Sequence, residues 1–189
     1  MRIYFDGPYI ILAGVILILT LVFMIYKLKT NSYFTVFFAL FYIYICLLIK
    51  YTQFPIVYIP EFVESHSVIS RINFIPFNKM THAPMNAFLN VVMTMPFGFL
   101  LPFVKRINSK KTIVIWAIVL PLLLEGLQLT IGMLTGYTER IIDINDVIFN
   151  FIGVIFGFSI FKGIVSLLNN FSIEKEWTKS SFFHFIKQR

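Results

Sequence analysis

Charged residues are scarce in this chain of 189 residues, where they make up only 13% of the sequence. Apolar residues make up 58%, and the mean hydropathy is +0.83. A chain with so few charges has too little polar surface to cover an ordinary water-soluble domain. The composition therefore excludes a soluble enzyme or binding module, and it indicates that most of the chain lies in lipid.

Cysteine is almost absent as well, because Cys46 is the only one and lies inside an apolar run. A single thiol excludes an intrachain disulfide framework and a thiolate metal site. The first apolar run also lacks a signal-peptide cleavage site, since it ends at Tyr26-Lys27-Leu28-Lys29 with no small-residue motif. We therefore expect this run to be a retained anchor and not a cleaved signal peptide.

Five apolar runs reach or approach the ~20 residues that an α-helix needs to cross a bilayer. They cover residues 8–26, 33–49, 86–104, 112–132 and 145–168. We predict an all-α integral membrane protein with about five transmembrane helices. No connection is long enough to hold a second core, so residues 1–189 are interpreted as one membrane domain. Residues 169–189 form a basic, aromatic tail.

Basic residues are divided unevenly between the two ends of the predicted helices. Ten of them share one end: Lys27, Lys29, Lys105, Arg106, Lys110, Lys111, Lys175, Lys179, Lys187 and Arg189. The other end receives five: Arg2, Lys50, Arg71, Lys79 and Arg140. The positive-inside rule then predicts an outer N-terminus, a cytoplasmic C-terminus and a long outer loop between the second and third helices. The rule also accounts for the net charge of +7 without a nucleic-acid partner.

Polar and small residues follow a helical spacing at the start of the fifth run. Intervals of 3, 3, 4, 3 and 4 separate Arg140, Asp143, Asp146, Asn150, Gly153 and Gly157. This spacing predicts that all six lie on one face of a helix from 140 to 157. Such polar residues are costly in lipid, so they must face protein, water or a ligand. The two glycines predict a close contact with another helix.

In the predicted orientation, three helices and the outer loop all place polar residues at the outer leaflet. The candidate ligand-binding residues are Arg71, Asn73, Asn90, Glu125, Gln128, Arg140, Asp143, Asp146 and Asn150. We predict no cofactor and assign no catalytic residue, because no nucleophile is evident nearby. A divalent cation held by the carboxylates is the lesser alternative. The favoured interpretation is pairing of the acids with the two arginines.

Glu125, in the outer half of the fourth predicted helix, has two interpretations. A carboxyl group at this depth can act as a general acid or base. The alternative is a neutral carboxyl group that hydrogen-bonds Asn90 or Gln128 and holds the helices together.

These residues belong to an ordered set of motifs over residues 68–160. The set begins with the segment from Arg71 to Phe77, followed by Asn90 and the segment from Met95 to Pro102. It continues with Glu125-Gly126-Leu127-Gln128 and ends with the segment from Arg140 to Gly153. In this set the chain resembles the VanZ-like family of bacterial membrane proteins. The resemblance implies a multi-pass protein of the bacterial plasma membrane. Some members of the family are linked to reduced susceptibility to teicoplanin-type glycopeptides, without an established reaction.

Three hypotheses of function follow from these residues and from the resemblance. The leading one is a VanZ-like envelope protein whose outer cluster binds membrane lipid, a lipid-linked envelope component or a lipophilic glycopeptide. In it, Arg71 and Arg140 bind phosphate or carboxylate. The second is an intramembrane enzyme that acts on lipid-linked envelope intermediates, with Glu125 or Asp143 as the base. A small permease is disfavoured, because the inner halves of the helices lack polar residues.

Overall fold

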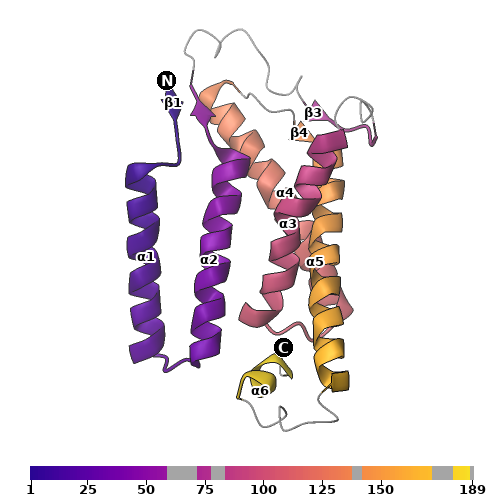
Figure 1. The fold of residues 1–189 in the computed structure, drawn as a ribbon. Coiled ribbons are helices and arrows are strands. Elements are labelled where there is room, and N and C mark those ends of the chain that lie inside the picture. Colours follow the sequence, from indigo (N-terminus) through magenta and orange to yellow (C-terminus); the bar gives the residue numbers. More distant parts are fainter. Residues whose placement is uncertain (59–71, 78–83, 138–141, 172–180, 188–189) are drawn as a thin grey trace.

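The structure is a computed structural model that describes residues 1–58, 72–77, 84–137, 142–171 and 181–187. Five long helices run side by side (Figure 1): α1 (Gly7–Tyr26), α2 (Ser32–Gln53), α3 (Pro84–Val104), α4 (Lys110–Thr135) and α5 (Ile144–Phe171). Each is long and apolar enough to cross a membrane, so the five predicted spans are confirmed. A short helix, α6 (Ser181–Lys187), follows near the C-terminus. The predicted orientation in the membrane remains a prediction.

Four two-residue strands lie at one end of the bundle, which we call the strand end (Figure 1). β1 (Arg2–Ile3) pairs antiparallel with β2 (Ile56–Val57), and β3 (Ile72–Asn73) pairs in parallel with β4 (Ile142–Asp143). The first pair joins the two ends of the α1–α2 hairpin. The second pair joins the segment before α3 to the residues that lead into α5.

Local capping residues explain where several helices begin and end. Asn31 precedes α2 and accepts a hydrogen bond from the backbone N–H of Tyr33 at 2.8 Å. Ser109 precedes α4 and accepts one from Thr112 at 3.2 Å. Such caps satisfy backbone N–H groups that the first helical turn leaves without a partner. Gly136 ends α4 with a φ of 66°, a left-handed conformation that glycine adopts readily.

The fifth helix begins later than the sequence spacing predicts, and this corrects the single helical face from 140 to 157. Asp143 belongs to β4, and α5 begins at Ile144. The side chain of Asp143 accepts a hydrogen bond from the backbone N–H of Asn145 at 2.9 Å, as an N-cap residue does. The helical face therefore begins at Asp146. Arg140 lies outside the described residues.

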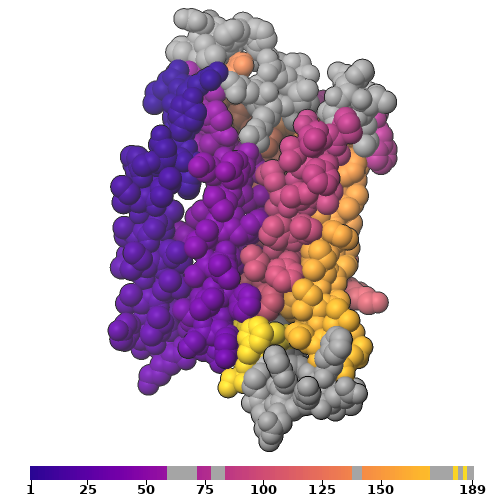
Figure 2. All heavy atoms as spheres, viewed as in Figure 1, coloured from indigo at the N-terminus to yellow at the C-terminus, as the bar shows by residue number. Residues whose placement is uncertain are grey.

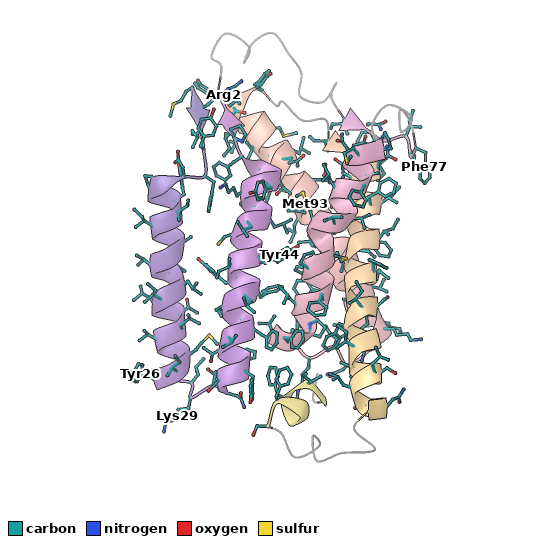
Figure 3. The ribbon with its side chains drawn as sticks, in the orientation of Figure 1. Arg2, Tyr26, Lys29, Tyr44, Phe77 and Met93 are labelled. Carbon is teal, nitrogen blue, oxygen red and sulfur yellow. The ribbon has the colours of Figure 1, made fainter. Side chains whose placement is uncertain are left out.

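Apolar packing concentrates on α3, α4 and α5. The main core cluster consists of Leu48, Phe97, Leu101, Ile107, Ile113, Ala117, Leu120, Leu124 and Val154. Met24 is the only buried residue within α1. The Tyr42 hydroxyl group of α2 donates a hydrogen bond to the Ala13 carbonyl of α1 at 3.1 Å. The Tyr44 hydroxyl of α2 likewise donates a hydrogen bond to the Met93 carbonyl of α3 at 2.8 Å. Figure 3 labels both residues.

Helices α3 and α5 approach each other so closely that only glycine fits at three positions. A Cβ atom added to Gly157 would lie 1.8 Å from the Met95 carbonyl oxygen, and one added to Gly153 would lie 2.2 Å from Thr94 Oγ1. From the α3 side, a Cβ atom on Gly98 would lie 1.9 Å from the Val154 carbonyl oxygen. The close contact predicted from Gly153 and Gly157 is therefore confirmed.

Helix α6 packs against the opposite end of the bundle from the strands. Figure 2 shows it between the ends of α2 and α5. Phe185 and Ile186 are buried there together with Phe103 of α3 and Phe161 of α5. The ring of Phe185 also lies 6.0 Å from the ring of Phe37 of α2, measured between centroids. Part of the predicted basic tail is therefore a helix that packs into the bundle.

Candidate functional site: a polar clasp at the strand end

The polar residues of β3 and β4 bond to one another across the parallel pair. Asn73 lies opposite Asp143 in the register, and Asn73 Nδ2 donates to Asp143 Oδ1 at 2.9 Å. The amide oxygen of Asn73 accepts a hydrogen bond from the backbone N–H of Ile75 at 3.2 Å. Since Asp143 also caps α5, one carboxylate fixes both the strand pair and the helix that follows it.

Asn145 holds the segment after β3 against the start of α5. Its side chain is only 6% exposed, and its amide oxygen accepts a hydrogen bond from the backbone N–H of Phe77 at 2.6 Å. Phe77 has a φ of 61°, which is uncommon for a bulky residue and therefore needs support from its surroundings. The sequence interpretation did not select Asn145. In the sequence, the feature that could have identified Asn145 is its position between Asp143 and Asp146 in an otherwise apolar segment.

A third set of polar contacts joins α3 to α5. Asn90 Nδ2 donates to Asp146 Oδ1 at 2.5 Å. One turn further along α3, the fully buried Thr94 hydroxyl lies 2.8 Å from the Asn90 carbonyl and 2.9 Å from the Asn150 carbonyl. Thr94 was also absent from the sequence-based set. A lone threonine gives no signal in the sequence until the glycines bring the facing helix within reach.

We call these residues the polar clasp: Asn73, Asn90, Thr94, Asp143, Asn145, Asp146 and Asn150. They tie β3, α3, β4 and the first turns of α5 into one unit. The clasp contains five of the nine predicted site residues, namely Asn73, Asn90, Asp143, Asp146 and Asn150. Its Asn73 and Asn90 amides donate to carboxylates, and such charge-assisted hydrogen bonds are stronger than neutral ones. This offsets part of the cost of partly burying the Asp143 and Asp146 side chains.

Gln128 belongs to a different contact, between α2 and α4. Its Nε2 atom donates to the Thr52 carbonyl at 3.1 Å, and Gln53 Nε2 donates to the Leu124 carbonyl at 3.2 Å. Glu125, the residue after Leu124, is 7% exposed. The sequence interpretation missed Thr52 and Gln53, because it ended the second helix at residue 49. Helix α2 continues to Gln53, where both polar residues are buried.

The two arginines of the predicted site, Arg71 and Arg140, lie outside the described residues, so their predicted pairing with the acids stays a prediction. A metal centre is a separate question. Within the described ranges, no group of three histidine, cysteine, aspartate or glutamate side chains is placed to hold a metal ion. The Asp143 and Asp146 carboxylates instead accept hydrogen bonds from amide groups.

A comparison with known protein families tests the family resemblance that the motifs indicated. A model of the VanZ/LLP1 family matches residues 41–168, which is more than half of the chain. The chain belongs to the VanZ/LLP1 family. No curated protein and no solved structure matches it.

The VanZ/LLP1 match covers most of α2, all of α3 and α4, and nearly all of α5. It includes every residue of the polar clasp and also the α2–α4 contact. The match begins at Phe41, so it takes in a helix that the motif-based resemblance over 68–160 had left outside. Helices α1 and α6 lie outside the match. Family membership and the five spans together describe a VanZ-like multi-pass membrane protein.

Proposed function

We propose that this VanZ-like protein lowers the susceptibility of a bacterium to teicoplanin-type glycopeptides by binding or altering a component of the cell envelope. In this proposal the protein resides in the bacterial plasma membrane with the strand end outside. The observation that carries the proposal is the polar clasp. It gathers seven polar residues from β3, α3, β4 and α5 at one end of a largely apolar bundle.

The clasp supports a binding role because intramembrane acids and amides are costly and are commonly found at functional positions. The clasp also fixes Asp143 and the start of α5, and Asp143 lies three residues after Arg140 in the chain. In the proposal, Arg71 and Arg140 bind the phosphate or carboxylate of the envelope component. A guanidinium group matches both anions with two parallel hydrogen bonds, whereas an ammonium group does not.

Drug susceptibility of a bacterium that expresses the chain tests the proposal. Wild type is compared with Glu125→Gln, Arg140→Ala, Arg140→Lys and Asp143→Asn for teicoplanin and vancomycin, with membrane abundance measured through a tag. We expect wild type to shift teicoplanin susceptibility, and Glu125→Gln and the two Arg140 variants to lose that shift at normal abundance. Asp143→Asn should lose the shift too, with some loss of abundance because the Asp143 side chain also caps α5. Arg140→Lys is expected to be nearly as damaging as Arg140→Ala.

Ser159→Ala is the matched control, because the Ser159 hydroxyl is exposed and donates to the Ile155 carbonyl of its own helix. It should keep the wild-type shift. The absence of any wild-type shift for either drug would overturn the resistance proposal. Loss of the variants from the membrane would instead assign the cluster to folding alone. Full function of Arg140→Lys would remove the bidentate argument.

The buried carboxyl group of Glu125 favours a second candidate function. In this alternative the protein is an intramembrane enzyme that acts on lipid-linked envelope intermediates at the outer leaflet, with Glu125 as the base. Asp143 is less suited to that role, because its Oδ1 atom already accepts two hydrogen bonds. Turnover of a lipid-linked substrate by purified protein, lost in Glu125→Gln, supports the enzyme. No turnover across a panel of such substrates argues against it.

A further inference from the structure

Four consecutive apolar residues are exposed at the strand end, outside the helices. They follow β3 as Phe74, Ile75, Pro76 and Phe77, and we call them the apolar segment. Phe74 is 75% exposed, and Ile75 and Phe77 are each 62% exposed. Figure 3 shows Phe77 at the outer edge of the strand end. Such a run is unfavourable on a surface that faces water, so its exposure indicates a contact with something apolar.

Side chains of the polar clasp hold the backbone of the apolar segment. The N–H group of Ile75 donates to Asn73 Oδ1 at 3.2 Å, and the N–H group of Phe77 donates to Asn145 Oδ1 at 2.6 Å. Pro76, between them, has no N–H group. These three successive residues therefore carry no backbone donor without a partner. A backbone that enters lipid must have its N–H groups satisfied in this way, because hydrocarbon offers them no acceptor.

The conformation of Phe77 shows that its exposed position is enforced by the clasp. Its φ of 61° lies in a region that bulky residues rarely adopt, and such conformations persist where the surroundings impose them. The group that imposes it here is Asn145, whose side chain is buried. The clasp thus supports a backbone conformation that leaves the aromatic side chain outside the bundle.

The depth of the apolar segment follows from the contact between α3 and α5. The bond from Asn90 to Asp146 places the start of α5 about 9 Å along α3 from Pro84, at 1.5 Å per residue. Phe77 bonds to Asn145, next to Asp146, so it lies at the same level. Helix α3 has 21 residues and is about 31 Å long, and the hydrocarbon core of a bilayer is about 30 Å thick. A helix of this length that crosses the core places the level of Phe77 inside the hydrocarbon.

The surface of α3 at this level is apolar as well, because Phe88 and Leu89 are exposed there. We propose that the apolar segment inserts into the bilayer, where Phe74, Ile75 and Phe77 contact the acyl chains of the leaflet at the strand end. The clasp holds the segment at that depth. The proposal depends neither on the glycopeptide phenotype nor on which side of the membrane the strand end faces, so it and the proposed function fail separately.

Spin labels on single cysteines test the insertion. Phe74→Cys and Ile75→Cys are made in a Cys46→Ala background, labelled with a nitroxide and reconstituted as the full chain into vesicles of phosphatidylcholine and phosphatidylglycerol. Collisions of the label with oxygen, which concentrates in hydrocarbon, are compared with collisions with a nickel chelate, which stays in water. Leu123→Cys, exposed near the middle of α4, is the lipid control, and Asn108→Cys, exposed in the turn before α4, is the aqueous control.

We expect the labels on Phe74→Cys and Ile75→Cys to collide more often with oxygen than with nickel, as on Leu123→Cys. More frequent collisions with nickel, as on Asn108→Cys, would overturn the proposal, because the segment would then lie in water. Low collision rates with both reagents would overturn it as well, since protein would then cover the segment.

Two further variants separate the role of the clasp from that of the side chains, with the label on Ile75→Cys. Asn145→Ala removes the acceptor of the Phe77 N–H group and should raise the rate of collision with nickel. Phe77→Gly keeps that N–H group and suits the positive φ, so it should leave the label in lipid. If Asn145→Ala does not fold, Asn73→Ala serves in its place, because it removes the acceptor of the N–H group of residue 75. A label that stays equally deep without its clasp acceptor would show that the clasp does not set the depth.

Discussion

Replacing Gly157 by alanine should separate α3 from α5 and destabilise the protein. The added Cβ atom would lie 1.8 Å from the Met95 carbonyl oxygen, where ordinary van der Waals contact begins at 3.4 Å. The backbone carbonyl cannot rotate away as a side chain can, so the helices must move apart by more than 1 Å. Overpacking of this kind typically costs about 1–3 kcal/mol. Because the clasp spans the same two helices, its hydrogen bonds lengthen as well.

Gly163→Ala provides the control on the same helix, since nothing lies within 4 Å of its added Cβ atom. Alanine is a better helix former than glycine by roughly 1 kcal/mol, so this substitution should leave stability unchanged or raise it. Only Gly157→Ala should therefore lower stability. The assay is unfolding of the purified full chain in mixed detergent, followed by circular dichroism. A Gly157→Ala protein as stable as Gly163→Ala would refute the close α3–α5 contact.

Two further predictions use pairs of variants that differ in burial. Thr94→Val should lower stability by about 1 kcal/mol, since the fully buried hydroxyl links α3 to the Asn150 carbonyl of α5. Thr130→Val, exposed on α4, should change it little, and equal effects on Tm would argue against the Thr94 contact. Phe185→Ala should cost about 3–5 kcal/mol because Phe185 is 6% exposed, whereas Phe182→Ala, at 38% exposure, should cost much less. Equal and small losses in thermal unfolding would show that α6 does not pack into the bundle.

The spans and the glycine contact were predictable because their signals are local. A run of about 20 apolar residues specifies a membrane helix wherever it occurs in the chain. Gly153 and Gly157 lie four residues apart, so both face the same neighbour whatever that neighbour is. The sequence also predicted that Asn90 and Asp146 lie at the same end of the bundle, because alternate helices run in opposite directions. It did not predict that they bond to each other.

The strand pair was not predictable, because its information is not local. Two-residue strands are too short for an alternating pattern, and β3 and β4 lie about 70 positions apart in the chain. Asp143 fitted the helical spacing of the residues after it, yet pairing with β3 places it in an extended conformation. The helix pattern was thus correct from Asp146 onward and wrong just before it. Gln53 was missed for a related reason, since a polar residue at the end of an apolar run resembles the start of a loop.

Hydrogen bonds among the described residues show which polar side chains hold the fold together. Asn73, Asn90 and Thr94 direct their donors at other parts of the clasp, so substitutions there should first reduce the amount of folded protein in the membrane. Gln53 differs because its amide nitrogen braces α4 while its oxygen has no partner among the described residues. Because Gln53 is buried and bonds to α4, its substitution should also lower the amount of folded protein. Measurements that report phenotype and abundance together therefore separate a loss of folding from a loss of function, whereas phenotype alone would merge them.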